Sequence, residues 1–203
     1  MTRRTLILVA GLPGTGKSRL GERIRSRFAG CREVSLDAIK EELWDAEGFE
    51  GPTEKEALNA RALEVYIERI DQAMQDATVV LSDYPFSVKQ RPALAALCRA
   101  RGVTPVTVRL VADLDVLYTR QRDRDLDASR HPGHVLTRYR PGETVPVRTE
   151  ADGLLTHEEF HRRCTTRGYD TFALGDLLEV DMTDFSTVDH DAILTWLAER
   201  IEG

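Results

Sequence analysis

The chain has 203 residues, of which 41% are hydrophobic and 31% charged, and its formal net charge is -6. This length suits one sizeable core, so we predict a single domain over residues 1–203, and the mild acidic charge argues against a whole-protein footprint for nucleic acid. No run approaches the roughly 18 to 20 apolar residues of a membrane span, so no membrane partner is expected. The cysteines, Cys31, Cys98 and Cys164, fit neither a disulfide framework nor a zinc site, and we expect a cytoplasmic location.

The strongest motif of the chain lies between its first apolar run and its first helical pattern. Residues 5–10 predict a strand, residues 18–28 predict a helix, and residues 11–18 match G-x-x-x-x-G-K-[ST]. Glycines in such a turn allow positive φ and a close approach to an anion, which also faces the positive end of the helix. A chance glycine-rich turn is the less favoured alternative. We expect nucleotide phosphates to bind Gly11, Pro13, Gly14, Thr15, Gly16, Lys17 and Ser18, with Mg²⁺ on the Ser18 hydroxyl.

Two aspartates follow short apolar runs, at the strand ends where ligands bind in α/β sheets. Residues 33–36 predict a second strand that ends at Asp37, before a helix over residues 38–44. Residues 78–83 predict a third strand ending in Asp83, the pattern of a Walker B acid that positions Mg²⁺ or its water ligands. The alternative role for Asp37 is to cap the helix that follows it.

Several further elements follow from capping patterns. Thr53-x-x-Glu56 predicts the start of a long helix with Leu63, Ile67, Ile70 and Met74 in its buried stripe. Later segments predict a helix opened by Ser87-x-x-Gln90, a strand over residues 103–111, a helix opened by Thr156-x-x-Glu159, a strand over residues 177–182 and a closing helix opened by Ser186-x-x-Asp189. Five strands that alternate with helices predict a three-layer α/β fold with a parallel sheet.

The segment 113–130 is the most highly charged part of the chain. Its arginines at 120, 122, 124 and 130 alternate with acids, which suits either a salt-bridged surface or a mobile lid that closes over a transferred phosphoryl group. Residues 125–153 are the expected insertion for substrate recognition. His131 and His134 stand on either side of Pro-Gly, so a shared helix face and a metal site are disfavoured, and we expect both to line a substrate pocket.

Together these residues resemble a group of P-loop kinases that includes the 5'-kinase domain of polynucleotide kinase, zeta-toxin-like kinases and chloramphenicol phosphotransferase. The resemblance covers roughly residues 5–124 and the last strand. It is carried by the phosphate loop, by Asp37, by Asp83 with Arg91 downstream, by Arg120 and Arg124 four apart, and by Val180-Asp181. Lys40 stands where the polynucleotide kinase branch has Arg, and the two side chains hold phosphate differently.

The resemblance implies a helical lid, a strand order of 2-3-1-4-5, and transfer of a phosphoryl group from ATP, with Mg²⁺, to a hydroxyl. It implies catalytic roles for Lys17, Asp37, Arg120 and Arg124, acceptor binding by Asp37, Lys40, Asp83 and Arg91, and adenine-side contacts from Arg120, Met182 and Thr183. Ser18 and Asp83 would serve the metal.

Three functions remain open from the sequence. The leading hypothesis is a kinase acting on a small-molecule alcohol. A 5'-hydroxyl polynucleotide kinase is opposed by the acidic charge, by Lys40 and by the lack of an aromatic and basic strip for single strands. A nucleotide-dependent switch would have no need of a carboxylate aimed at an acceptor. The sequence leaves the acceptor and the oligomeric state open.

Overall fold

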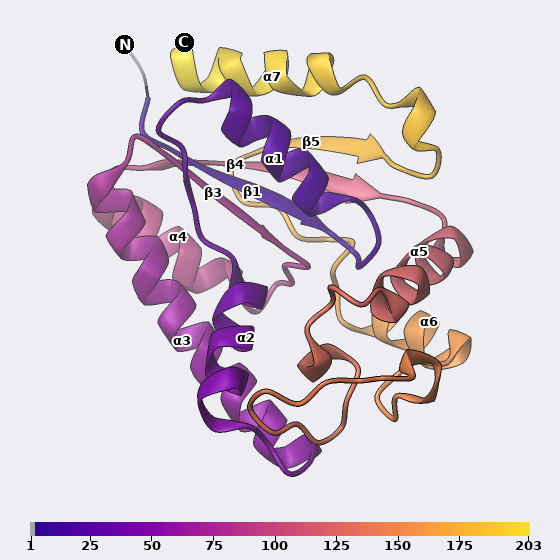
Figure 1. Cartoon of the computed structure of the whole chain (residues 1–203). Helices are drawn as coiled ribbons and strands as arrows, with labels where there is room; N and C mark the ends of the chain where they lie inside the picture. The colour runs from indigo at the N-terminus through magenta and orange to yellow at the C-terminus, as the bar shows by residue number, and fades with distance from the viewer. Residues whose placement is uncertain (1–2) are drawn as a thin grey trace.

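A five-stranded parallel sheet forms the centre of the computed structural model, which describes residues 3–203 (Figure 1). The strands are β1 (Thr5–Gly11), β2 (Arg32–Glu33), β3 (Val79–Tyr84), β4 (Thr104–Val111) and β5 (Asp176–Asp181). Their order in the sheet is β2-β3-β1-β4-β5, and all four pairings are parallel. The predicted α/β class and the strand order 2-3-1-4-5 are therefore confirmed.

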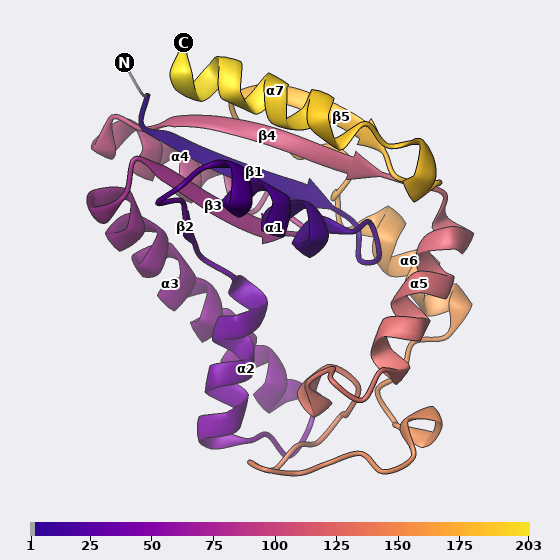
Figure 2. The same cartoon turned by 45° about the horizontal axis from the view of Figure 1, so that its top comes forward.

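Helices cover both faces of this sheet. They are α1 (Lys17–Arg27), α2 (Leu36–Glu47), α3 (Pro52–Asp76), α4 (Arg91–Arg101), α5 (Leu114–Leu126), α6 (His157–Thr166) and α7 (His190–Glu202). The helices α1 and α7 lie on one face, α3 and α4 lie on the other, and α5 and α6 stand beyond the carboxyl ends of the strands (Figures 1 and 2).

The central strand β1 shows why the core has two halves. All seven of its residues are buried, because helices cover the sheet on both sides. Successive side chains of a strand point to opposite faces. Ile7 and Val9 accordingly pack with residues of α1 and α7, whereas Leu6 and Leu8 pack with residues of α3 and α4.

The second strand is shorter than predicted, and this changes the setting of Asp37. The ladder ends at Glu33, and α2 begins at Leu36 because the Ser35 hydroxyl accepts a hydrogen bond from the amide of Ala38 at 3.3 Å. Asp37 therefore lies in the first turn of α2 and does not end a strand. Its suggested role as the helix cap is wrong, since Ser35 takes that position.

Two further capping predictions were wrong. Gly51 precedes α3 without a side-chain cap, and Pro52 occupies the first turn, where its missing N–H costs nothing. The closing helix α7 is capped by Asp189, which accepts from the amide of Ala192, and not by Ser186. The prediction for α6 is confirmed, because Thr156 accepts from the amide of Glu159.

The start of α4 and the buried stripe of α3 also differ from the predictions. Gln90 is the residue before α4, and its side chain accepts hydrogen bonds from the amide and the hydroxyl of Ser87. In α3, Leu63 and Ile67 are only partly buried. The helix buries a neighbouring stripe, made of Leu58, Ala62, Tyr66, Ile70, Ala73 and Met74.

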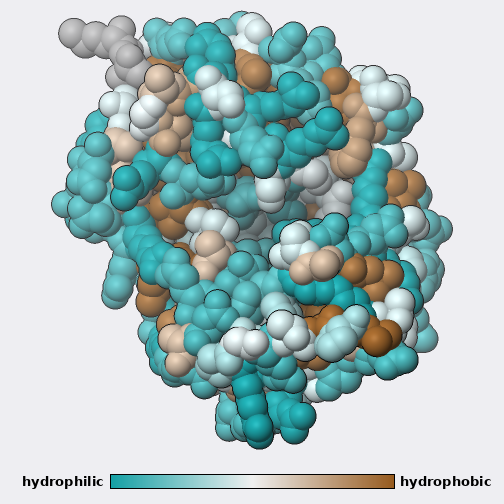
Figure 3. Space-filling model, viewed as in Figure 1, coloured by the Kyte–Doolittle hydropathy of each residue, from teal (hydrophilic) through white to brown (hydrophobic). Residues whose placement is uncertain are grey.

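The segment 125–153 runs irregularly past the ends of α2 and α3 (Figure 1). Tyr139 pairs with Phe49 in an isolated antiparallel bridge, and both rings pack with Trp44 and Leu58. Most of the surface on the face shown in Figure 3 is hydrophilic. Among residues 3–203, no helix is long and apolar enough to cross a membrane.

Candidate active site

The loop between β1 and α1 has the backbone that anion binding requires. Gly14 and Gly16 both adopt a φ of 85°, and a Cβ atom at Gly14 would lie 2.8 Å from the carbonyl oxygen of Leu117. Gly16 precedes α1 without any side-chain cap, so the first-turn amides of α1 have no capping side chain. The Thr15 hydroxyl closes the loop by donating to the carbonyl of Leu12 at 2.8 Å. Uncapped amides at the positive end of a helix fit a phosphate chain.

Lys17 and Ser18 follow this loop directly. The Lys17 ammonium donates to the Leu12 carbonyl at 2.9 Å. Burial lowers the pKa of Lys17 to about 8, although the charges of Asp83 and Asp37 oppose that shift. The Ser18 hydroxyl donates to the Asp83 carboxylate at 2.9 Å. One hydroxyl and one carboxylate are oxygen ligands of the kind Mg²⁺ prefers, so Ser18 and Asp83 could hold the metal, as the sequence predicted.

A cleft of about 700 Å³ opens beside the loop, at the carboxyl ends of the strands. In Figure 2 the bordering elements α2, α5 and α6 surround this end of the sheet. Its lining comes from the loop and the start of α1 (Pro13, Gly14, Gly16, Lys17, Ser18, Arg19), from α2 and its cap (Ser35, Asp37, Ala38, Lys40, Glu41), from the end of β3 (Asp83, Tyr84, Pro85) and from residues beyond β4 (Arg120, Gln121, Arg124, Arg130, His134, Leu155, Phe160, Arg163, Cys164, Arg167, Tyr169, Phe185).

Asp37 is the carboxylate that α2 presents to this cleft. Its Oδ1 lies 3.3 Å from the Lys40 ammonium and its Oδ2 lies 4.0 Å from the Arg130 guanidinium. Burial by itself would raise the pKa of Asp37, but the positive charges of Lys40, Arg130 and Arg124 hold it well below the ordinary value. The lowered pKa keeps the carboxylate ionised, and its 35% exposure makes it accessible from the cleft.

Lys40 is held between the Asp37 carboxylate and Tyr84. Its ammonium donates to the Tyr84 hydroxyl at 3.3 Å and lies 4.7 Å from the centre of that ring. Burial favours the neutral amine, but Asp37 and Tyr84 outweigh it and raise the pKa of Lys40. The ammonium is therefore a fixed charge at the wall of the cleft.

The two histidines of the His-Pro-Gly-His segment have different positions. His134 lines the cleft, and its Nε2 lies 2.6 Å from a Glu41 oxygen. Burial lowers the pKa of His134 to about 4, so its imidazole is neutral near neutral pH. His131 lies outside the cleft, with its Nε2 3.0 Å from Asp45 and its Nδ1 accepting from the Gly133 amide. The structure therefore brings only one of the pair to the cleft.

The two predicted lid arginines both line the cleft, in different surroundings. Arg120 donates to the carbonyl oxygens of Met182 and Thr183 at 2.7 and 2.9 Å, and its guanidinium lies 3.7 Å from the centre of the Phe185 ring. It therefore connects α5 to the loop after β5. The side chain of Arg124 is exposed and has no ion-pair or hydrogen-bond partner within residues 3–203.

The other predicted site residues divide between the cleft and its surroundings. Gly11 is buried at the end of β1, Thr15 is buried in the loop, and Met182 is buried beside Gly16. Arg91 is exposed at the start of α4 and is not part of the cleft lining. The structure thus separates Arg91 from the other predicted acceptor residues.

Sequence reasoning missed part of the acceptor side. The missed residues are Glu41, Tyr84, Arg163, Arg167, Tyr169 and Phe185; Arg130, one of the arginines named in the charged segment 113–130, also lines the cleft. The predicted third strand ended at Asp83, whereas β3 ends at Tyr84; extending the prediction by one residue would have included Tyr84. The others come from separate elements, and no local pattern connects them.

A sequence model of the AAA domain family matches residues 6–142, more than half of the chain, so the protein belongs to that family. The fold is that of P-loop kinase-like proteins. A search of curated proteins found no match.

Solved structures show the same fold over the whole chain. A candidate kinase from Chloroflexus aurantiacus J-10-fl is similar, with a TM-score of 0.75 and 22% sequence identity over 100% of this chain and 98% of its own. A tunicamycin resistance protein from Deinococcus radiodurans is also similar, with a TM-score of 0.52 and 17% identity over 98% of this chain and 96% of its own. At such identities the likeness concerns the fold.

Proposed function

We propose that the protein is an ATP- and Mg²⁺-dependent kinase that transfers the γ-phosphoryl group to a hydroxyl of a small molecule. The observation that carries this proposal is the shared cleft: the ionised carboxylate of Asp37 and the phosphate loop line the same cavity. A nucleotide-binding loop suffices for a switch, whereas a carboxylate facing the same space gives an acceptor hydroxyl a place to dock.

The nucleotide side needs few residues. Lys17 and the first-turn amides of α1 would hold the phosphates, and Ser18 and Asp83 would hold the metal. A magnesium ion held there would supply positive charge against the charge that develops on the phosphate oxygens. The phosphates would also replace the Leu12 carbonyl as the partner of Lys17, which favours its charged form.

Asp37 would act mainly by orienting the acceptor. Its lowered pKa makes it a weak base, but it keeps the carboxylate ionised and able to accept a hydrogen bond from an acceptor hydroxyl. In a loose phosphoryl-transfer transition state the hydroxyl proton leaves late, so position matters more than basicity. Lys40 and Arg130 hold the carboxylate in place.

The two lid arginines would divide their roles. The guanidinium of Arg124, which has no hydrogen-bond or ion-pair partner within the described residues 3–203, is available to meet charge on the transferred group. Arg120, with Met182 and Thr183, would form the adenine side of the nucleotide site, because it is anchored on their carbonyl oxygens and on the Phe185 ring.

The acceptor side of the cleft is rich in basic and aromatic side chains. Lys40, Arg163, Arg167, Tyr84 and Tyr169 line it. This lining favours a polar acceptor that carries an anionic group or a planar ring. Phosphorylated and ring-bearing alcohols therefore belong in an acceptor screen beside neutral ones.

The experiment is a transfer assay with γ-labelled ATP and Mg²⁺. The acceptors are a nucleoside panel, sugar phosphates, alcohol-bearing antibiotics including tunicamycin, and a 5'-hydroxyl oligonucleotide. Labelled small-molecule product from the natural protein, lost in Asp37→Asn and kept in Asp45→Asn, would support the proposal. Asp45 is a suitable control because it lies on the same helix, outside the cleft. Labelling of the oligonucleotide alone would favour the polynucleotide kinase, and ATP binding without any labelled product would favour the switch.

A further inference from the structure

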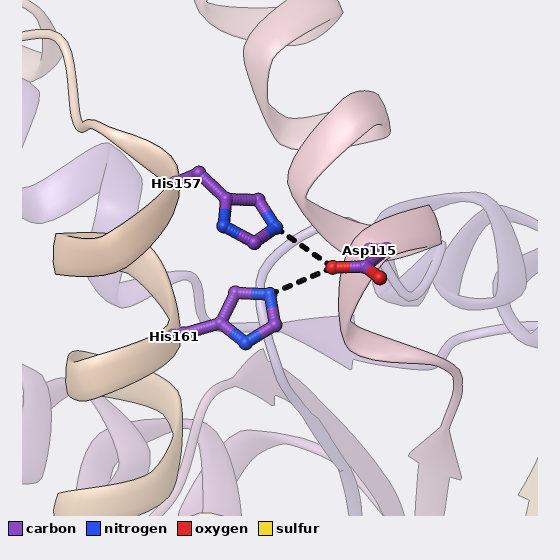
Figure 4. Close-up of side chains that lie close together, drawn as sticks. All are labelled: Asp115, His157 and His161. Atoms are coloured by element: carbon purple, nitrogen blue, oxygen red, sulfur yellow. Dashed lines mark hydrogen bonds and ion pairs between the residues drawn. The ribbon is translucent and has the colours of Figure 1, made fainter.

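Three side chains with metal-binding atoms meet on the outer surface, where α5 and α6 lie side by side (Figure 4). His157 and His161 come from α6, and Asp115 comes from the first turn of α5. The Nε2 atoms of His157 and His161 lie 2.7 and 3.0 Å from the same oxygen, Oδ1 of Asp115. One ligand atom from each residue lies within 4.8 Å of the other two.

The spacing explains why these groups converge. Residues four apart on a helix share a face, so both imidazoles project from α6 in one direction, with ring centres 4.2 Å apart. The carboxylate approaches them from the other helix (Figure 4). Two imidazole nitrogens and one carboxylate oxygen form a common ligand set for Zn²⁺ and related transition metals, in which water completes the coordination.

We propose that Asp115, His157 and His161 form a surface site for a divalent transition metal such as Zn²⁺. The site differs from the Ser18 and Asp83 pair, whose oxygen ligands suit Mg²⁺. Its three residues also lie outside the residues that line the cleft.

The surroundings of the three ligands suit a metal ion. The side chains are 54% (His157), 31% (His161) and 73% (Asp115) exposed, so an ion and its waters can reach them.

The backbone that carries these ligands is well supported. The side chain of Asp113 caps α5 by accepting from the amides of Asp115 and Val116. Beneath the site, the ring of Tyr118 packs against His157 at 4.9 Å and against Phe160 at 5.7 Å. Packed turns of this kind hold ligand side chains close to the geometry that binding needs.

A bound ion would connect two helices that border the cleft. α5 also carries Arg120 and Arg124, and α6 carries Arg163, all of which line the cleft. Metal binding at the outer surface would therefore stabilise the packing of α5 on α6. This effect can be measured without any kinase activity.

The test is a titration of the whole protein with Zn²⁺ by calorimetry, together with thermal unfolding with and without Zn²⁺. We expect one site per chain and a higher Tm with Zn²⁺, because an ion that binds only the folded state stabilises it. Co²⁺ in place of Zn²⁺ should give visible absorption that reports nitrogen and oxygen ligands. The ligands are exposed or partly exposed, so His157→Ala, His161→Ala, Asp115→Asn and the triple variant that combines these changes should fold normally.

Each of these variants should bind Zn²⁺ more than about tenfold more weakly, since even outer-shell changes cost about 10- to 100-fold. His190→Ala on α7 is the matched control and should bind as the natural protein does. The absence of Zn²⁺ binding in stoichiometric excess would overturn the proposal. So would equal affinity in the triple variant, because the ion would then bind elsewhere, for example at a cysteine.

Discussion

The nucleotide side of the cleft is built largely from one stretch of chain, whereas the acceptor side is assembled from distant segments. Residues 11–18 form the phosphate loop and the start of α1, Asp83 joins them from β3, and the proposed adenine side adds Arg120 and the loop after β5. On the acceptor side, Asp37 and Lys40 come from α2, Tyr84 from β3 and Arg130 from the segment after α5. A local motif therefore defines phosphate binding, while the acceptor site depends on how several elements pack.

The largest effect is expected on the nucleotide side. Lys17→Ala removes the one lysine that the loop places at the phosphates, so turnover should fall by about 10³-fold or more and ATP should bind more weakly. Calorimetry with ATP and a transfer assay measure both quantities. Lys89→Ala, at an exposed position between β3 and α4, is the control. Unchanged affinity and turnover in Lys17→Ala would mean that the loop is only structural.

On the acceptor side, Asp37→Asn should lower kcat by about 10²- to 10⁴-fold and leave ATP affinity nearly unchanged. The amide keeps an acceptor atom but loses the charge that Lys40 and Arg130 surround. Asp45→Asn on the same helix should keep full activity. A folded Asp37→Asn protein with full turnover would contradict the proposed role of Asp37 in orienting the acceptor. The acceptor side of the cleft would then have no demonstrated function beside the nucleotide side.

The next largest effect on kcat is expected from the loss of the Arg124 side chain. If it meets charge that develops in the transition state, Arg124→Ala should lower kcat by about 10²-fold with little change in ATP affinity or Tm. Arg122→Ala is the matched control, since Arg122 is exposed on the same helix and does not line the cleft. Equal kcat in the two variants would favour a purely structural role for this charged helix.

The lowered pKa of Lys17 predicts that the affinity for ATP depends on pH. Burial lowers the pKa of Lys17 to about 8, so the amine is charged below that pH and neutral above it. Because ATP binds the charged form better, its dissociation constant should rise about tenfold per pH unit above about 8. Calorimetry across this range tests the effect, which should disappear in Lys17→Ala. A flat profile in the natural protein would show that Lys17 does not titrate there.

The smallest effect concerns the attachment of α2 to the sheet. The buried Tyr66 hydroxyl donates to Ser82 at 2.9 Å, and Ser82 donates to the carbonyl of Val34, just before α2. Tyr66→Phe should lower the free energy of unfolding by about 1 kcal/mol and leave ATP affinity unchanged. Urea unfolding measures the loss. Tyr118→Phe is the control, and an equal loss in both variants would mean that the buried hydroxyl chain adds no stability.

Local sequence patterns determined the sheet and the phosphate loop. The apolar run of β1, the glycines at 14 and 16 and the pair Lys17-Ser18 act through backbone conformation and neighbouring residues, so they can be recognised without the rest of the chain. The pairing of Ser18 with Asp83 was also within reach, because parallel strands bring their carboxyl ends to one edge.

The residues of the acceptor side, and those of the proposed surface metal site, come together only in the tertiary structure. Arg130 lies beside Asp37 because of where the segment after α5 packs, whereas Arg91, at the start of α4, lies outside the cleft lining. The meeting of Asp115 with His157 and His161 likewise depends on the packing of α5 against α6. Such contacts join residues dozens of positions apart, and neither helical nor strand periodicity carries information about them.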